Sequence, residues 1–382
     1  MPKKKKTKKT KKTHLKQIKQ TKEKNNKTLI IITISLIIFF AILYKINKPK
    51  EKPPEETIQT PSNKISTETQ LLIPVNATYQ LNIQKEDPES PLTYILKDTN
   101  CVSIDTNGLL TAKRSGKTIL TIKSISDEIQ IKITTTDLLI SRDQEYNHDK
   151  TNVAKHKFTK EENDFLDEQL KKQINEKGYH TRAATVEAAR FLTIDFAYSI
   201  PYFYENGRIS YGVDGQGRYY HEGLYLCNEK TNELKYKSKN AAPWGQVIYS
   251  SPARSKHPNG LDCSGFVTWA LYNAGYDVGD IGSGITGDYD LTDIGVNLKN
   301  IKDNLDKIKV GDLLHSNEAG GHIGMIVGID DEYIYFAQAI WYHGATVQVT
   351  KIDKNNIPKY YDLAVLLDDF YGEEGKLTDM WY

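Results

Sequence analysis

One cysteine of this chain stands where its thiol could act as a nucleophile. Residues 259–271 read NGLDCSGFVTWAL, a polar turn followed by apolar residues at helical spacing, so Cys263 lies in the first turn of a predicted buried helix. Unpaired backbone N–H groups and the positive end of the helix dipole would face its sulfur and lower the thiol pKa. The N–H of Cys263 itself is the simplest oxyanion hole. A free cysteine is also often a buried structural residue, so Cys263 alone leaves two interpretations evenly matched.

Three downstream segments could supply partners for the thiol. They are a turn into a strand at 310–314 (VGDLL), a strand at 321–328 (GHIGMIVG) and a second strand at 333–340 (YIYFAQAI). His322 opens an otherwise apolar strand and has no packing reason to be there, which makes it the candidate base. A hairpin at 329–332 would bring Gln338 opposite His322, where its amide could orient the imidazole. His343 is a rival for this orienting role.

The order of these motifs resembles that of the NlpC-type cell-wall cysteine peptidases. DCSGF, GDL and the GHIG strand match the family pattern, and the resemblance covers residues 181–369, about half of the chain. It implies an α+β papain-like domain with the catalytic residues Cys263, His322 and Gln338. It further implies an endopeptidase that hydrolyses peptidoglycan stem peptides at a bond to the γ-carboxyl of D-Glu. Neither a metal nor an organic cofactor is implied.

The same resemblance suggests which residues meet the substrate. An amphipathic helix predicted over residues 181–199 runs into a Pro-Tyr sequence, and in the family a tyrosine near this point lines the substrate pocket. Tyr202 is the positional match and Tyr204 is a close rival. In family members that cut after a short stem peptide, residues such as Asp262 and Ser264 beside the thiol help to bind a free amino terminus. Asp262 could instead cap the helix, and both interpretations stay open.

The family pattern is interrupted between the Pro-Tyr sequence and the DCSG turn. Residues 205–258 stand where the family has a short glycine-rich loop, and they contain several glycines and many tyrosines. Connections of this length are usually functional or disordered, and the aromatic content argues for order. We therefore expect this insert to cap or narrow the substrate groove, with His221 and Cys227 as structural residues.

The amino-terminal region predicts a membrane anchor. Residues 1–27 are almost all Lys, Thr, Gln and Asn, and residues 28–44 form an uncharged apolar run at the short end of the length that a bilayer needs. The Lys excess before the run would keep the amino end in the cytoplasm and export the rest. A basic arm can also bind nucleic acid, but the apolar run favours the membrane. A cleaved signal peptide is the alternative, disfavoured by the long basic region and the lack of a cleavage site.

Two segments separate this anchor from the catalytic domain. Residues 45–68 are rich in Lys, Pro and Glu and read as an extended linker. Residues 69–136 alternate short β-type runs with turns, which predicts a small β-sandwich. Their stretch VSIDTNGLLTAKRSGKTILTI resembles the bacterial Ig-like (group 2) domains, which implies a spacer or adhesive module. Residues 137–180 form a second linker with a connecting helix that Thr159 caps, and residues 370–382 form a carboxyl-terminal tail.

These segments predict a multi-domain fold: a transmembrane helix, a small all-β Ig-like sandwich and an α+β papain-like catalytic domain outside the cell. Its partners would be peptidoglycan stem peptides and the membrane, with no nucleic acid. The three cysteines are an odd and sparse count, which argues against a disulfide framework. No two of them have C-x-x-C spacing, which argues against a zinc site. Two other functions stay open: a non-catalytic wall-binding or adhesion protein, and an amidase or acyltransferase that uses the same triad on another substrate.

Overall fold

The chain divides into two compact units, Met1–Ser62 and Asn63–Tyr382. The computed structural model describes only parts of the second unit, namely residues 64–142, 146, 150–153, 156–202, 261–278, 281–284, 289–317, 321–341 and 346–382. The predicted basic tail at 1–27, the predicted membrane span at 28–44 and most of the linker at 45–68 therefore lie outside the described residues.

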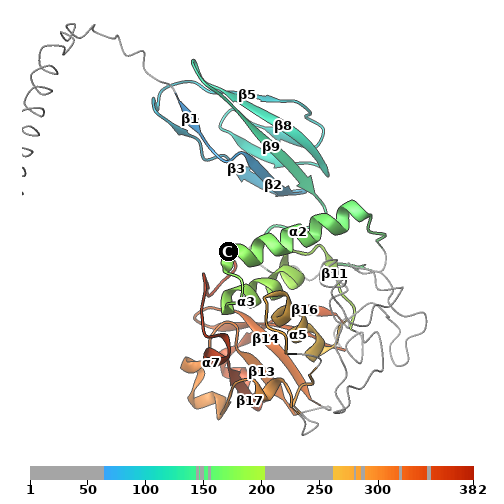
Figure 1. The fold of residues 1–382 in the computed structure, drawn as a ribbon. Coiled ribbons are helices and arrows are strands. Elements are labelled where there is room, and N and C mark those ends of the chain that lie inside the picture. Colours follow the sequence, from blue (N-terminus) through green and yellow to red (C-terminus); the bar gives the residue numbers. More distant parts are fainter. Residues whose placement is uncertain are drawn as a thin grey trace, which may run out of the picture. The chain divides into compact units, whose positions relative to one another are not determined.

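The first described region is built of short strands. They are β1 (Ile65–Ser66), β2 (Gln70–Pro74), β3 (Thr78–Gln80), β4 (Gln84–Lys85), β5 (Thr93–Leu96), β6 (Val102–Ile104), β7 (Leu109–Ala112), β8 (Gly116–Lys123) and β9 (Glu128–Thr136). A four-stranded sheet has the order β2-β9-β8-β5 and a three-stranded sheet the order β3-β7-β6 (Figure 1). Inward-facing residues of both sheets, among them Leu110 and Leu120, share one core, because alternating side chains leave each sheet one apolar face to bury.

The rest of the described chain contains a larger sheet and its helices. The helices are α2 (Lys160–Lys177), α3 (Arg182–Arg190), α5 (Cys263–Asn273), α6 (Ile357–Tyr360) and α7 (Asp368–Tyr371). The strands are β10 (Thr151–Asn152), β11 (Tyr198–Ser199), β12 (Val296–Lys299), β13 (Leu313–Ser316), β14 (His322–Ile329), β15 (Tyr333–Ala339), β16 (Val347–Asp353) and β17 (Leu363–Leu366). The last six form one antiparallel sheet of order β12-β17-β13-β14-β15-β16.

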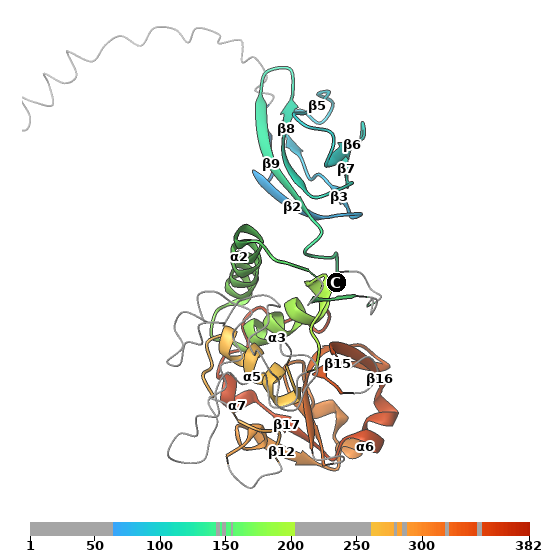
Figure 2. The same ribbon diagram turned by 90° about the vertical axis from the view of Figure 1, so that its right-hand side faces the viewer.

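Helices α3 and α5 pack against β14 on the same face of this sheet (Figure 2). Residues on alternate positions of β14, such as Ile323 and Met325, join the core that contains α5. Ile326 belongs to a second core on the opposite face, together with Phe336 of β15. Both faces are therefore buried, which explains why β14 and β15 are apolar almost throughout.

The connecting helix α2 begins and ends where the sequence predicts. The Thr159 hydroxyl accepts a hydrogen bond from the N–H of Glu162, and the Glu162 carboxylate accepts one from the N–H of Thr159, so the capping box is present. Gly178 follows the last turn with φ 104°, a conformation that suits glycine. The predicted capping box and stop are confirmed.

The helix predicted over 181–199 is shorter than expected. Its α-helical part ends at Arg190, a π-helical turn follows at Phe191–Asp195, and Phe196 is extended. The ammonium of Lys150 donates to the carbonyls of Thr193, Ile194 and Phe196 at 2.7–3.1 Å. Because these carbonyls are satisfied by a side chain, the helix can stop here without leaving buried acceptors unpaired.

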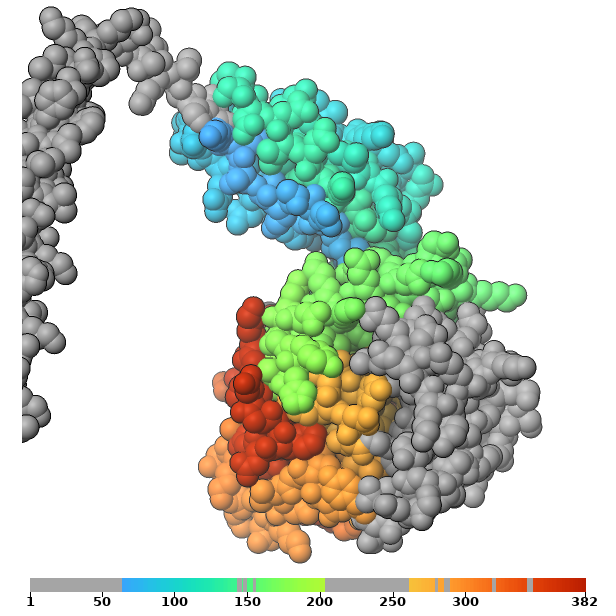
Figure 3. Space-filling view, in the orientation of Figure 1, coloured from blue at the N-terminus to red at the C-terminus, as the bar shows by residue number. Residues whose placement is uncertain are grey.

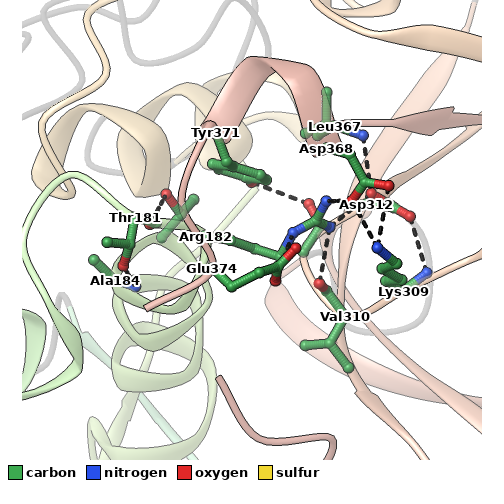
Figure 4. A network of polar contacts seen from close by, with 12 residues as sticks. Thr181, Arg182, Ala184, Lys309, Val310, Asp312, Leu367, Asp368, Tyr371 and Glu374 are labelled. Atoms are coloured by element: carbon green, nitrogen blue, oxygen red, sulfur yellow. Dashed lines mark hydrogen bonds and ion pairs between the residues drawn. The ribbon is translucent and has the colours of Figure 1, made fainter. Parts of the chain in front are cut away.

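A buried arginine joins α3 to the turn before β13 (Figure 4). Arg182 is fully buried, and its guanidinium donates to Asp312 at 2.8 Å and to the carbonyl of Val310 at 3.1 Å. It also pairs with Asp368 of α7 and lies 4.9 Å from the ring centre of Tyr371. These contacts of Arg182 hold the predicted Gly-Asp turn in place, and the turn in turn positions the start of β13.

The carboxyl-terminal segment, drawn in red in Figure 3, lies against the helices and the sheet. The N–H groups of Arg182 and Ala183 donate to the carbonyls of Glu373 and Glu374, and the side chain of Arg190 bonds to Thr378. The predicted tail at 370–382 is therefore part of the folded unit.

The predicted fold class needs correction. Within the described residues, no helix combines the length and the apolar character that crossing a bilayer requires. The described chain is mostly β-sheet, arranged in several sheets, so the expected papain-like α+β fold is not shown. The physical reason is that the helical stretches are brief. The helix predicted over 181–199 is α-helical only to Arg190, and most of the chain from 296 onward forms strands.

Candidate active site

Helix α5 begins at Cys263 because Asp262 caps it. Asp262 is extended, and its Oδ1 accepts hydrogen bonds from the N–H of Gly265 at 2.8 Å and from the Ser264 hydroxyl at 3.2 Å. Nearly all residues of the helix are buried, so packing holds this short apolar helix in place. The sequence left open whether Asp262 caps the helix, and the cap is present.

The thiol of Cys263 is buried and protonated. Hydrogen bonds from the backbone at Ile323, at Ser264 and at Cys263 itself act to lower its pKa, as expected for a helix start. Burial raises the pKa more strongly, and the charge of Asp262 adds to this, so that the pKa of Cys263 lies at about 12. The predicted lowering of the thiol pKa is wrong, because desolvation of the thiolate outweighs the donors at the helix start.

His322 and Gln338 meet as the sequence predicts. Nε2 of His322 lies 2.5 Å from Oε1 of Gln338. An amide oxygen only accepts, so Nε2 carries the proton and Nδ1 keeps its lone pair for use as a base. The other end of the amide, Nε2 of Gln338, donates to Oγ1 of Thr350 at 2.7 Å.

The imidazole of His322 is held neutral. Burial lowers its pKa below the ordinary 6.5, the bond to Gln338 acts in the opposite direction, and the neighbouring His315 lowers it further. A neutral imidazole is the form that can accept a proton. The candidate nucleophile and the candidate base are therefore both uncharged at neutral pH.

The thiol and the imidazole both lie at the start of β14. Cys263 contacts the backbone at Ile323, whose side chain joins the core around α5. The ring of His322 makes an edge contact with Phe336 at 6.3 Å between centroids. His322 is also the first residue of the strand. Cys263 and His322 are thus brought to neighbouring residues of one strand, since the backbone at Ile323 contacts the thiol and His322 precedes it.

Gly324 makes room for the pair of His322 and Gln338. A Cβ at this position would lie 2.5 Å from Cζ of Phe336 and 3.0 Å from Cβ of Gln338. Any larger residue would displace one of these side chains. The second glycine of the GHIG motif, Gly324, is therefore required for steric reasons, because the side chains next to the hydrogen bond between His322 and Gln338 leave no space for a Cβ.

Tyr202 and Ser264, the other predicted site residues, lie close to Cys263 in the chain or in space. Tyr202 forms a bridge with Leu261, two residues before the thiol, and its side chain packs against the core that contains Cys263. Ser264 is buried beside Cys263. The rivals Tyr204 and His343, and the insert at 205–258 with His221 and Cys227, lie outside the described residues.

Sequence reasoning missed two polar residues near the site. His315 of β13 pairs with Ile323 and is almost fully buried, and among the described residues neither of its ring nitrogens has a hydrogen-bond partner. Thr350 of β16 supports Gln338. The only signal for His315 was its place after GDLL, and nothing in the sequence singled out Thr350. In the part of the chain that the structure describes, no three His, Cys, Asp or Glu side chains are placed to hold a metal ion.

Solved structures resemble the chain only weakly. The crystal structure of the S-layer protein rSbsC(31-844) is 16% identical, covers 19% of this chain and 13% of that chain, and has a TM-score of 0.18. The crystal structure of a bacterial Ig-like domain-containing GH10 xylanase from termite gut is 13% identical, covers 23% and 22%, and has a TM-score of 0.17. Such low scores carry no argument, so the predicted Ig-like assignment of 69–136 is not supported.

A family model described as bacteriophage peptidoglycan hydrolase matches residues 237–361, and no curated protein matches the chain. The matched range contains Cys263, His322 and Gln338. It begins inside the insert at 205–258, so part of that segment falls within the family pattern. The match does not establish the NlpC type, but it supports a peptidoglycan hydrolase domain in this chain.

Proposed function

We propose that this domain hydrolyses amide bonds in peptidoglycan stem peptides by thiol chemistry. Cys263 is the nucleophile, His322 its base and Gln338 the group that orients the base. One observation carries the proposal: the strand whose backbone contacts the buried thiol begins with a histidine that is hydrogen bonded to Gln338. The position of His322 also argues for function, because a partly buried histidine at the start of an otherwise apolar strand contributes little to packing.

The proposed mechanism starts from a neutral pair. With the thiol pKa at about 12 and the His322 pKa lowered, a standing thiolate–imidazolium pair is disfavoured. Nδ1 of His322 would take the thiol proton as the sulfur attacks the substrate carbonyl. The N–H of Cys263 would stabilise the oxyanion. The imidazolium then protonates the leaving amine, and a water activated by His322 hydrolyses the thioester.

The residues around the thiol would recognise the substrate. Asp262 lies beside Cys263, and its negative charge raises the pKa of the thiol. A negative charge is therefore present next to the nucleophile. A substrate ammonium near Asp262 would be attracted by the same charge. Ser264 and Tyr202 would complete the contacts, and the insert at 205–258 would narrow the groove.

The bond to be cut is proposed from the resemblance to the NlpC-type peptidases. The full-length protein should be incubated with purified muropeptides and the products identified by mass spectrometry, with Cys263→Ala as the control. Cleavage after D-Glu, with a new free γ-carboxyl, supports the endopeptidase. Release of an intact stem peptide from the sugar indicates an amidase, and transfer to an added amine indicates an acyltransferase. Binding without turnover would leave a non-catalytic wall-binding protein.

The site of action is proposed to be outside the cytoplasm, where peptidoglycan lies. Protease added to intact cells should degrade the described domains, while a cytoplasmic marker protein survives. Protection of both would contradict this location.

A further inference from the structure

A polar chain crosses three adjacent strands at the candidate base. It runs from His322 of β14 through Gln338 of β15 to Thr350 of β16, with separations of 2.5 Å and 2.7 Å. Gln348 is directly opposite Gln338 in the register, and Thr350 lies two residues further along β16, on the same face. Such a diagonal neighbour is within reach of a long side chain.

Gln338 cannot orient the base unless its own amide is held. A glutamine has three side-chain torsions, and its amide can turn over and exchange donor and acceptor ends. Only the observed orientation presents Oε1 to Nε2–H of His322, which leaves the lone pair on Nδ1. Gln338 is 4% exposed, so water cannot easily replace a missing protein partner.

Thr350 supplies the acceptor for the opposite end of this amide. It is β-branched and lies within a seven-residue strand, so its hydroxyl has little freedom. With an acceptor at 2.7 Å the NH₂ group is satisfied in the orientation that serves His322. Without that hydroxyl, the same orientation would leave a buried donor unpaired, and a turned amide would become competitive.

We propose that Thr350 is a positioning residue for catalysis: its hydroxyl fixes the Gln338 amide and, through it, the proton on Nε2 of His322. This rests on the proposed function for its effect on turnover, whereas its effect on the imidazole can be measured independently. Thr350 would not contact the substrate. Its influence would pass entirely through Gln338.

The test compares Thr350→Val, which removes only the hydroxyl, with Thr350→Ser, which keeps it. Thr350→Val should lower kcat by about tenfold with KM unchanged, a fraction of the 10²–10⁴-fold that a general base contributes. Thr350→Ser should retain most of the activity. Thr121→Val, at a half-buried threonine of β8, is a matched control and should leave kcat unchanged. Thermal unfolding of each variant checks that it is folded.

Two further readouts separate positioning from a structural role. In a Gln338→Ala background, Thr350→Val should cause no additional loss, because the two residues act as one unit. Nitrogen-15 spectra of the histidine rings should show the His322 proton on Nε2 in the wild type and a mixture of tautomers in Thr350→Val. Unchanged tautomers, or additive losses in the double variant, would overturn the proposal. If the wild type cuts no muropeptide, the proposed function fails, and the tautomer measurement still decides the role of Thr350.

Discussion

At the level of single residues, burial sets the protonation state of the candidate catalytic groups. It raises the pKa of Cys263 to about 12 and lowers the pKa of His322. The lowered pKa of His322 has a consequence for stability. Its contribution is fully present above the unfolded value near 6.5 and is lost as the pH falls through the lower folded value. The thiol of Cys263 and the imidazole of His322 are therefore both neutral before the substrate binds. In the proposed mechanism the proton moves from the thiol to the imidazole only as the sulfur attacks.

Cys263→Ala and His322→Ala should each reduce kcat by at least about 10³-fold, because they remove the nucleophile and its base. The double variant should be no worse than either single variant. Muropeptide turnover measured by chromatography checks this, with circular dichroism as the control for folding. Residual cleavage by Cys263→Ala at near wild-type rates would end the cysteine-hydrolase interpretation.

Gln338→Glu should move the acidic limb of the kcat/KM profile to higher pH. A carboxylate facing the ring favours the imidazolium and raises the pKa of His322, by about 1–3 units for a close opposite charge. The catalytic neutral form then appears only at higher pH. Gln348→Glu, on the neighbouring strand, is the control and should shift the limb less. An unmoved limb in Gln338→Glu would show that His322 is not the group that titrates.

Asp262→Asn should make Cys263 more reactive toward iodoacetamide. The charge of Asp262 raises the thiol pKa, and asparagine removes the charge while it still caps the helix. Mass spectrometry of alkylated peptides gives the rate, with the buried Cys101 as an internal reference. Asp262→Ala should additionally lower the free energy of unfolding by about 1 kcal/mol, because the cap is lost. Equal alkylation rates in Asp262→Asn and wild type would mean that the charge is screened.

At the level of elements, the site depends on how closely β14 and β15 pack. Gly324 lies between Phe336 and Gln338, with no space for a Cβ. The strand pairing continues on both sides, from Ser316 of β13 opposite His322 to Gln348 of β16 opposite Gln338. The hydrogen bond between His322 and Gln338 therefore depends on the pairing of β13, β14, β15 and β16 as well as on the two residues themselves.

Gly324→Ala should therefore reduce kcat by about tenfold or more, since the added methyl would collide with Phe336, with the carbonyl of Ala337 and with Gln338, and would displace the part of β15 that presents Gln338 to His322. Overpacking of this kind also costs roughly 1–3 kcal/mol of stability. Gly328→Ala on the same strand meets Trp381 and Met380 instead, so it should lose stability with less effect on kcat. Kinetics and denaturant unfolding of both variants check this. Equal loss of kcat in the two would contradict a specific effect on the His322–Gln338 pair.

At the level of the whole molecule, Arg182 ties together segments that are far apart in the sequence. It links α3 to Asp312 before β13 and to Asp368 after β17. Burial raises the pKa of Asp312, and Arg182 opposes this by pairing with it. One buried charge thus connects helix α3 to the neighbouring strands β13 and β17, and its partner Asp312 lies 130 residues away in the sequence.

Arg182→Ala should lower the free energy of unfolding by about 3–5 kcal/mol, because it leaves the buried carboxylate of Asp312 without its partner. The loss should shrink at acidic pH, where Asp312 can take up a proton. Lys309→Met is the control, since Lys309 contacts Asp368 with half of its side chain exposed and should cost at most about 1 kcal/mol. Denaturant titrations at two pH values provide the measurement. A loss as small as that of the control would contradict a structural role for the buried pair.

The sequence by itself determined the features that depend on neighbours along the chain. It located the capping box of α2, the start of α5 at Cys263 and the strand that begins at His322, because caps and short apolar runs are local features. The hairpin between β14 and β15 also followed from its turn, and with it the contact between His322 and Gln338.

Tertiary structure decided what depends on residues far apart in the sequence. Burial of the Cys263 thiol by segments far away in the sequence raises its pKa. The backbone donors at the helix start are local, and from them alone the sequence predicted a lowered pKa, which is the wrong direction. Lys150 binds the carbonyls at the end of the π-helical turn that follows α3, and the exposed edge strand β12 forms because β17 pairs with it. Thr350 can accept a hydrogen bond from the Gln338 amide only because the register of β15 and β16 places the two residues near each other. Desolvation and strand pairing are properties of the assembled sheet, and no local pattern encodes them.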